Sequence, residues 1–304
     1  MSHRSEGLRH NALVYESQDE LLARAVPFLL EGIEAGEGAV VAHTKPGLAM
    51  MRDALGSDAE HVMFVDVGSA YTRPARTLAA YHKVYAEQLE MKPTLRAVAD
   101  VQFGPDPAEW DLWTVYEAVF NRSFAHLPAW VVCSYNANGS PDRILEGVWQ
   151  THPEVIEREM WSTSERYEDP DDLLRRLVPS PDPISELGSI GAGRDEEDFR
   201  ERLARELLAD SVPETQVLDM LLASTEIYAN ARQHGGGVED VRVGRAEGRF
   251  VCEIVDQGEG FDDPTAGYLA PRDGVGTGLW VARQLTWRIE FFRSPAGFTA
   301  RISL

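Results

Sequence analysis

The sequence predicts two α/β domains in tandem: a parallel sheet covered by helices on both faces, then a two-layer α/β sandwich. Apolar strands alternate with amphipathic helices from about residue 10 to residue 155, the pattern of a mostly parallel sheet. From Asp198 onward two helices precede paired strands, and a stretch rich in Pro and Gly separates the two patterns. We therefore expect a first domain over 8–155, a linker over 156–195 and a second domain over 196–304.

The first domain is predicted from short apolar runs separated by helical periodicity. Strands are expected at 11–15, 39–43, 61–66, 95–101 and 130–135. Helices are expected at 20–35, from Lys45, between the third and fourth strands, and at 108–125 and 142–149. The inner face of the helix at 20–35 is predicted to carry Leu21, Leu22, Ala25, Val26, Leu29 and Leu30.

The second domain is predicted as one layer of helices on a mixed sheet. Helices from about 199, 215 and 279 cover strands at 238–245, 249–255, 289–293 and 298–303. The first of these helices carries Phe199, Leu203, Leu207 and Leu208. One buried face of the second is predicted from spacings of three and four among Val217, Leu218, Leu221, Leu222, Ile227 and Ala231.

Composition limits the classes of partner. The chain of 304 residues is 43% hydrophobic and 26% charged, which is typical of globular proteins. Its net charge of −21, from 50 acidic against 29 basic residues, repels nucleic acid and anionic lipid, so we expect neither nucleic-acid nor membrane binding. No secretory leader or membrane-spanning run is evident, which predicts a cytoplasmic protein. Cys133 and Cys252 lie in apolar runs and are expected to be buried free thiols.

Ligands of parallel sheets bind past the carboxyl ends of the strands. Four segments are expected at that edge, 15–19, 43–46, 66–68 and 133–136. Tyr15, Asp66 and Tyr135 are candidate contacts for a small molecule, with capping of strands and helices an equal alternative. No close Cys/His spacing supports a metal site, so packing and capping are the favoured interpretation of His10, His43 and Cys133.

The second domain contains three short polar blocks, and the first lies in a helical pattern. Glu226 and Asn230 are four residues apart and stack on one side of that helix. The Asn oxygen is a ligand type that Mg²⁺ accepts, and the Glu can orient or deprotonate a nucleophile. For this block alone, a solvated polar pair is the favoured alternative.

The other two blocks follow a strand and open a helix. Asp256 ends the strand whose Phe250, Cys252 and Ile254 share a face, and the chain then turns through Gly258 and Gly260. A carboxylate there can accept a hydrogen bond from the exocyclic amine of adenine, although an Asp-Gly turn is the simpler interpretation. The glycine-rich block 274–278 opens the helix 279–285, whose free amides favour phosphate. Its alternative is a flexible loop with a helix cap. The segment 261–273 between the two blocks is predicted to be a mobile cover.

Together the blocks resemble the N, G1 and G2 boxes of the GHKL (Bergerat-fold) ATPases, over roughly the last third of the chain. Residues 226–235 are most similar to the anti-sigma factor serine kinases, whose Glu-x-x-x-Asn-Ala…His-Gly pattern is matched at Glu226, Asn230, Ala231, His234 and Gly235. The resemblance implies that Asn230 binds Mg²⁺, that Asp256 binds the adenine of ATP and that Glu226 is the catalytic base. The remaining nucleotide contacts that it implies are Gly258, Gly260, Gly274, Gly276, Thr277, Gly278 and Leu279. Arg232 and Gln233 before His234, and the three glycines at 235–237, depart from the pattern without removing a ligand.

The first domain resembles the MEDS sensory domain (methanogen/methylotroph, DcmR-type). The resemblance rests on His10 with Leu13-x-Tyr15, on Phe28-Leu-x-x-Gly-Ile-x-x-Gly-Glu37, on Cys133-Ser-Tyr-Asn136 and on Thr151-His-Pro153. It implies a RecA/KaiC-like, three-layer fold. The first strand-to-helix turn, 15–20, lacks the phosphate-binding pattern G-x-x-x-x-G-K-S/T, so we expect a sensor without ATPase activity.

The resemblance implies a function for the whole chain. The second domain would use ATP–Mg²⁺ to phosphorylate a serine or threonine of an STAS-domain anti-anti-sigma factor, and a sigma factor would compete for the same surface. A homodimer is an assembly that the resemblance also allows. Three alternatives stay open: a binding module that holds ATP without transferring phosphate, a histidine kinase whose acceptor lies in another protein, and a small-molecule enzyme in the first domain. His152 precedes a proline, which disfavours a phosphoacceptor helix there.

Overall fold

The protein is described by a computed structural model that covers residues 7–70, 73–103, 107, 110–157, 160–178, 182, 184–269, 276–294 and 296–304. It divides into two compact units, Met1–Leu177 and Val178–Leu304, which are described separately. Both units are α/β, as the sequence predicts. Among the helices of the described residues, none combines the length and the apolar character that a bilayer crossing needs.

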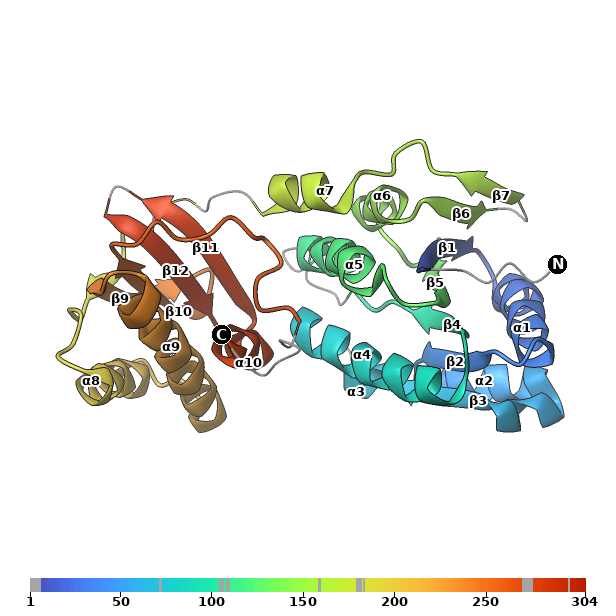
Figure 1. Ribbon diagram of the computed structural model, residues 1–304, viewed down its shortest axis with the longest axis horizontal. Helices are drawn as coiled ribbons and strands as arrows, with labels where there is room; N and C mark the ends of the chain where they lie inside the picture. Colours follow the sequence, from blue (N-terminus) through green and yellow to red (C-terminus); the bar gives the residue numbers. More distant parts are fainter. Residues whose placement is uncertain are drawn as a thin grey trace. The chain divides into compact units, whose positions relative to one another are not determined.

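The first unit is built on a seven-stranded sheet in the order β3-β2-β4-β5-β1-β6-β7 (Figure 1). Every neighbouring pair is parallel except β6 with β7. Strand β1 pairs with β5 through Arg9↔Trp130 and with β6 through Asn11↔Glu154. The strands are β1 (Arg9–Tyr15), β2 (Gly38–His43), β3 (Val62–Asp66), β4 (Leu95–Asp100), β5 (Ala129–Asn136), β6 (Glu154–Glu157) and β7 (Met160–Thr163).

Helices cover both faces of this sheet, which confirms the three-layer prediction. On one face, α1 and α2 pack against alternate strand residues such as Leu13, Val41 and Val132. On the opposite face, α4 and α5 pack together through rings of Tyr85, Phe120 and Phe124. The helices are α1 (Gln18–Glu34), α2 (Lys45–Leu55), α3 (Val67–Ala70), α4 (Pro74–Met91), α5 (Trp110–Phe124), α6 (Asp142–Thr151) and α7 (Pro170–Leu177), with a 3₁₀ turn at Gly56–His61.

Much of the segment expected to be a linker is secondary structure of the first unit. Strand β6 joins the sheet beside β1, and β7 continues it as an antiparallel edge. Helix α7 packs against α5 and buries Leu173 and Leu174 completely. The physical reason is the hydrophobic effect, because packing on the first unit removes the apolar surface of these side chains from water. The expected linker start at residue 156 is therefore wrong in the structure.

The second unit is built on a five-stranded sheet in the order β11-β12-β10-β9-β8. All its neighbouring pairs are antiparallel, so the predicted mixed sheet is wrong. The reason is that β12 inserts between β10 and β11 and is antiparallel to both. The strands are β8 (Gly188–Ser189), β9 (Val238–Ala246), β10 (Arg249–Asp256), β11 (Arg288–Ser294) and β12 (Gly297–Ser303).

Helices α8 (Glu196–Ala209), α9 (Glu214–His234) and α10 (Thr277–Leu285) pack with the apolar side chains of this sheet in one core. Asp195 caps α8 by accepting a hydrogen bond from the Asp198 amide (2.9 Å), and Phe199 stacks on Tyr228 of α9 at 4.3 Å between centroids. The predicted faces are partly wrong: the exposed fractions of Leu208, Leu218 and Leu222 are 68%, 59% and 57%. Ser224 and Tyr228 are buried on α9 instead, which an apolar period cannot reveal.

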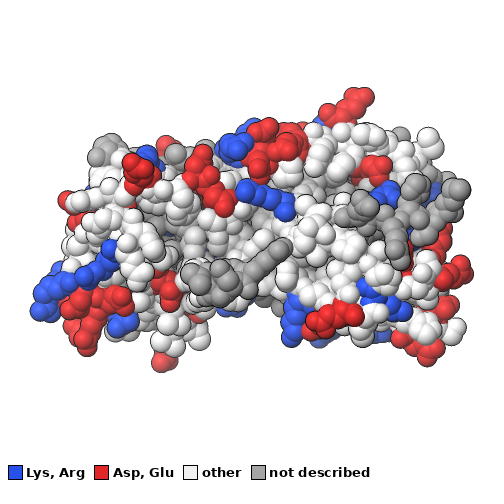
Figure 2. Space-filling model, in the orientation of Figure 1, with Lys and Arg blue, Asp and Glu red and all other residues white. Residues whose placement is uncertain are grey.

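Acidic and basic side chains are interspersed on the face of the molecule drawn in Figure 2. Ion pairs also tie elements of the first unit together. Arg96 of β4 donates to Glu37 (2.6 Å) and to Glu31 of α1 (3.2 Å), which fixes the end of α1 on the sheet. The thiols of Cys133 and Cys252 are both free and buried, as predicted.

We predict that Leu173→Ala destabilises the protein by about 2–5 kcal/mol, because it leaves a cavity between α7 and α5. The matched control is Met91→Ala, which removes a side chain of the same unit that is 68% exposed and should cost little. Urea unfolding followed by tryptophan fluorescence measures both changes. Equal, small effects would show that α7 is not part of the packed unit.

Candidate functional site

Helix α9 carries two of the predicted site residues at the border of its buried face. Ile227, Tyr228 and Ala231 are buried in the core, whereas Glu226 and Asn230 are half-buried. Their spacing of one helical turn places both side chains on the same side of α9. They therefore lie on a rigid element and are accessible from its rim.

The glycine-rich turn at the start of α10 meets Glu226. Thr277, Gly278 and Leu279 form the first turn of α10, preceded by Gly276 in the left-handed region at φ 77°. A Cβ added to Gly278 would collide with the carboxylate oxygen Oε2 of Glu226. Any larger residue would displace the Glu226 carboxylate, whereas glycine lets the free amides of the helix N-terminus approach it. Gly274 lies outside the described residues.

At the other end of α9, Gly235 meets Asp256. A Cβ on Gly235 would lie 2.5 Å from Oδ2 of Asp256, and one on Gly258 would lie 2.8 Å from the Cα of Gly235. The amide of Gly258 donates to Oδ1 of Asp256 (2.8 Å), which orients the carboxylate at the end of β10. Burial raises the pKa of Asp256 above its ordinary value. The turn of the second block therefore lies against the end of the helix that carries the first.

Asn230 lies between these two contacts. With a rise of 1.5 Å per residue, it is about 6 Å along the helix axis from Glu226 and about 7.5 Å from Gly235. The structure therefore brings Glu226 to Gly278 and Gly235 to Asp256 and Gly258, with the Asn230 carboxamide between them. Gly260 is placed differently, because a Cβ there would collide with the ring of Phe298 on β12.

The expected cover is attached to α10 through a side chain that sequence reasoning missed. Arg283 is buried and donates from Nε to the carbonyl of Ala266 (2.6 Å) and from Nη1 to the carbonyl of Ile289 (3.2 Å). Its guanidinium carbon lies 4.2 Å from the ring centroid of Tyr268, a cation–π contact. The part of the cover around Ala266 and Tyr268 is therefore held in place, and residues 270–275 lie outside the described residues. An arginine within an apolar helix was the available signal.

In the first unit, a pocket opens at the carboxyl edge of the parallel sheet. Tyr15, Thr44, Asp100 and Asn136 line it together with residues of the following loops, Val101, Gln102, Phe103, Trp110, Gly139, Ser140, Pro141 and Ile144. Tyr15 and Asn136 are thus brought together as predicted for this edge. Asp66 instead accepts a hydrogen bond from the Gly68 amide (3.0 Å) and caps α3, while Tyr135 donates to Glu117 (3.1 Å).

Among the residues of this pocket, Asp100 has the pKa that is shifted furthest from its ordinary value, and sequence reasoning missed this residue. Burial raises its pKa to about 7, against a hydrogen bond from Gln102 (2.5 Å) that favours the charged form. The nearest oxygen of Asp100 is 3.3 Å from Nδ1 of His43, which accepts from the Thr44 amide (2.8 Å). Burial lowers the pKa of His43 to about 4, so this contact is not an ion pair at neutral pH. Burial and Asp100 raise the pKa of Tyr15 to about 12.

The structure also brings together residues for which the spacing did not favour a metal site. His10 Nε2 lies 3.2 Å from Cys133 Sγ, beside Glu117 and His152, and all four residues are buried. Sequence reasoning did not consider Glu117 or His152 as metal ligands, because the four positions are far apart in the chain. His43, the other histidine weighed as a ligand, belongs to the carboxyl-edge pocket.

We predict that Asp100→Asn abolishes a pH dependence of stability. The pKa of about 7 in the folded protein exceeds the ordinary value of 3.8, so the favourable contribution to stability is present at low pH and is lost as the pH rises through 7. Between pH 5 and 8, the free energy of unfolding of the parent should fall by on the order of 2 kcal/mol more than that of the variant. Urea unfolding at both pH values measures this, with the exposed Asp53→Asn as control. Parallel losses in parent and Asp100→Asn would contradict it.

Comparison with known proteins gives one match for each unit. Residues 9–153 match the family model of the MEDS domain, the methanogen/methylotroph, DcmR sensory domain. Residues 195–304 match the model of the histidine kinase-like ATPase domain. No curated protein matches the chain. Among solved structures it is similar to the cytoplasmic domain of EssC, at 15% identity and a TM-score of 0.28, over 59% of this chain and 35% of that one.

The two family matches lie on the two folds described above. The first covers the parallel-sheet unit through the end of α6, and the second covers α8 to the end of the antiparallel sheet. An ATPase domain with α9 and α10 arranged around Glu226 and Asn230 supports binding of ATP. The chain is therefore an ATP-binding regulator in which a MEDS sensory domain precedes a domain of the histidine kinase-like ATPase family.

Proposed function

We propose that the second domain is a serine/threonine protein kinase of the anti-sigma type, which uses ATP and Mg²⁺ and is controlled by the MEDS domain. The observation that carries the proposal is the joining of three separate segments along α9. Glu226 meets the first turn of α10, Gly235 meets the Asp256 turn, and Asn230 lies between them. Along α9, the candidate phosphate, Mg²⁺ and adenine contacts follow one another in the order in which these groups occur in a bound nucleotide.

Each part of ATP has a matching group in this arrangement. The carboxylate of Asp256 accepts a hydrogen bond from the exocyclic amine of adenine, and the backbone at Gly258 allows the flat ring to approach. The amides of Thr277, Gly278 and Leu279 hold phosphate oxygens at the N-terminus of α10. The neutral carboxamide oxygen of Asn230 fits Mg²⁺, which keeps several waters and takes few protein ligands. When bound, Mg²⁺ neutralises charge on the phosphates.

Glu226 orients the hydroxyl of the protein substrate and accepts its proton. Its carboxylate is half-buried and already faces the turn that would hold the phosphates. Positioning and charge neutralisation supply most of the catalysis in phosphoryl transfer, so a single well-placed carboxylate suffices. We propose an STAS-domain anti-anti-sigma factor as the substrate and a sigma factor as the competing partner. His152 is fully buried and is the C-cap residue of α6, which disfavours it as a phosphoacceptor.

We predict that Asn230→Ala weakens binding of Mg²⁺–ATP by about 10- to 100-fold, the cost of a lost charge-assisted contact. The matched control is Gln233→Ala, one turn along the same helix at an exposed position, which should bind like the parent. Calorimetric titration with ATP, with and without Mg²⁺, measures the effect. Equal affinities of the two variants would remove Asn230 from the site.

We predict that Glu226→Gln keeps ATP binding but lowers transfer to an STAS partner by about 10²- to 10⁴-fold, because the amide cannot accept a proton. The two side chains have the same shape, so the packing against Gly278 is retained. Transfer of labelled γ-phosphate to a purified STAS domain, as acid-stable phosphate, is the measurement. A parent protein that binds ATP and the partner but never transfers phosphate would make the domain a binding module, and acid-labile product would make it a histidine kinase.

A further inference from the structure

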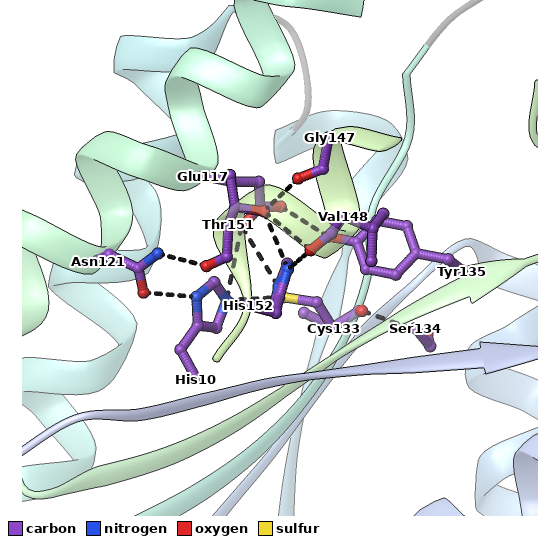
Figure 3. A network of polar contacts seen from close by, with 11 residues as sticks. His10, Glu117, Asn121, Cys133, Ser134, Tyr135, Gly147, Val148, Thr151 and His152 are labelled. Atoms are coloured by element: carbon purple, nitrogen blue, oxygen red, sulfur yellow. Dashed lines mark hydrogen bonds and ion pairs between the residues drawn. The ribbon is translucent and has the colours of Figure 1, made fainter. Parts of the chain in front are cut away.

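Four side chains from four separate elements converge inside the MEDS domain (Figure 3). His10 comes from β1, Glu117 from α5, Cys133 from β5 and His152 from the end of α6. Their ligand atoms all lie within 4.8 Å of one another, and the residues are at most 4% exposed. Such a set contains the nitrogen, sulfur and oxygen donors that divalent transition metals bind in proteins.

The hydrogen bonds around His10 direct one ring nitrogen to the centre of the cluster. Asn121 donates from Nδ2 to the carbonyl of Thr151 (2.6 Å), so its Oδ1 faces Nδ1 of His10 at 2.9 Å (Figure 3). An amide oxygen only accepts, and Nδ1 of His10 therefore carries the proton. The lone pair of His10 is left on Nε2, 3.2 Å from Cys133 Sγ and 3.5 Å from Glu117 Oε2.

The ring of His152 is oriented in the same way. Its Nδ1 lies 3.0 Å from the carbonyl oxygen of Val148, which can only accept, so Nδ1 is the donor. Its Nε2 then presents a lone pair 4.0 Å from Glu117 Oε2. Neither atom has a hydrogen-bond partner within the described chain, although both are fully buried. Two unsatisfied acceptors facing each other in the interior are costly.

Hydrogen bonds within the described chain do not satisfy this cluster. Tyr135 donates to the other oxygen of Glu117, Oε1 (3.1 Å), and leaves Oε2 facing the two histidines. Oε2 lies 3.5 Å from Nε2 of His10, and the 4.0 Å between Oε2 and Nε2 of His152 is too long for a hydrogen bond. The buried Nε2 of His152 therefore has no partner among the described residues.

We propose that His10 Nε2, Glu117 Oε2, Cys133 Sγ and His152 Nε2 bind one divalent transition-metal ion of the zinc type. Bond lengths of about 2.0–2.3 Å give tetrahedral ligand-to-ligand distances of roughly 3.3–3.7 Å. The three distances 3.2, 3.5 and 4.0 Å are close to these values. A thiolate and a carboxylate balance a charge of +2, so the occupied site is neutral and suited to a buried position.

The surrounding residues act as metal-site partners commonly do, by orienting the ligands from behind. Asn121 holds His10, the Val148 carbonyl and the Thr151 hydroxyl (3.0 Å) hold His152, and Tyr135 holds Glu117. A surface pocket lined by His10, Asn121, Pro153 and Tyr167 offers an entry path. All four positions are filled by protein, which indicates a structural or sensing role and not a catalytic one. This proposal does not depend on the kinase activity.

The test uses tag-free, full-length protein stripped with a strong chelator and titrated with Co²⁺. We expect intense visible bands of tetrahedral Co²⁺ and a thiolate-to-metal absorption in the near ultraviolet, saturating at one equivalent and abolished by Zn²⁺. Cys133→Ser should lose the thiolate absorption. Cys252→Ser, which changes the other buried thiol, should keep it. A thiolate band that persists in Cys133→Ser, or none in the folded parent, overturns the proposal.

Two further measurements test the site even if Cys133→Ser fails to fold. Asn121→Ala changes no ligand and should weaken Co²⁺ binding about 10- to 100-fold, as loss of a supporting hydrogen bond does at other sites. Zn²⁺ should raise the Tm of the stripped parent, because a ligand that binds only the folded state stabilises it. A stripped parent whose Tm does not respond to Zn²⁺, or Asn121→Ala with unchanged Co²⁺ affinity, contradicts the site.

Discussion

The proposed nucleotide site depends on close approaches at three glycines. Gly278 lets the start of α10 approach Glu226, and Gly235 and Gly258 let the Asp256 turn approach the end of α9. A Cβ on Gly235 or Gly258 would collide with backbone atoms, so the Asp256 turn would have to move away from α9. A Cβ on Gly278 would displace the carboxylate of Glu226. The helix itself is fixed by the core below it, where Tyr228 stacks on Phe199. Packing on one face of α9 thus sets the geometry of the candidate site on the other.

The MEDS domain separates two kinds of polar group by layer. At the carboxyl edge of its sheet, Asp100 and Tyr15 line an open pocket in which a small molecule can reach a carboxyl that titrates near neutrality. Beneath α5, His10, Glu117, Cys133 and His152 form a buried cluster whose ligand atoms lie within 4.8 Å of one another. The open pocket suits a small molecule that binds and dissociates, whereas the buried cluster suits an ion that stays bound. The sensory domain would then combine an exchangeable ligand site with a permanent ion site.

The sequence predicted the elements better than the way they pack. Short apolar runs and helical periodicity predicted where strands and helices lie, because an element that buries one face repeats apolar residues at its own period. Periodicity failed where polar residues are buried, as at Ser224, and where apolar ones are exposed, as at Leu222. The candidate nucleotide residues could be grouped from the sequence because they lie in short blocks. The four residues of the His10 cluster could not, since they are separated by up to 142 positions and are brought together only by the packing of α5 and α6 on the sheet.

The proposed function requires ATP and Mg²⁺ to occupy the space between α9 and the first turn of α10. A crystal structure of the full chain with Mg²⁺ and a non-hydrolysable ATP analogue tests this most directly. We expect the adenine amine on the Asp256 carboxylate, the metal on the Asn230 oxygen and the phosphates on the amides of Thr277 and Gly278. A nucleotide bound elsewhere, with these groups unoccupied, would contradict the account.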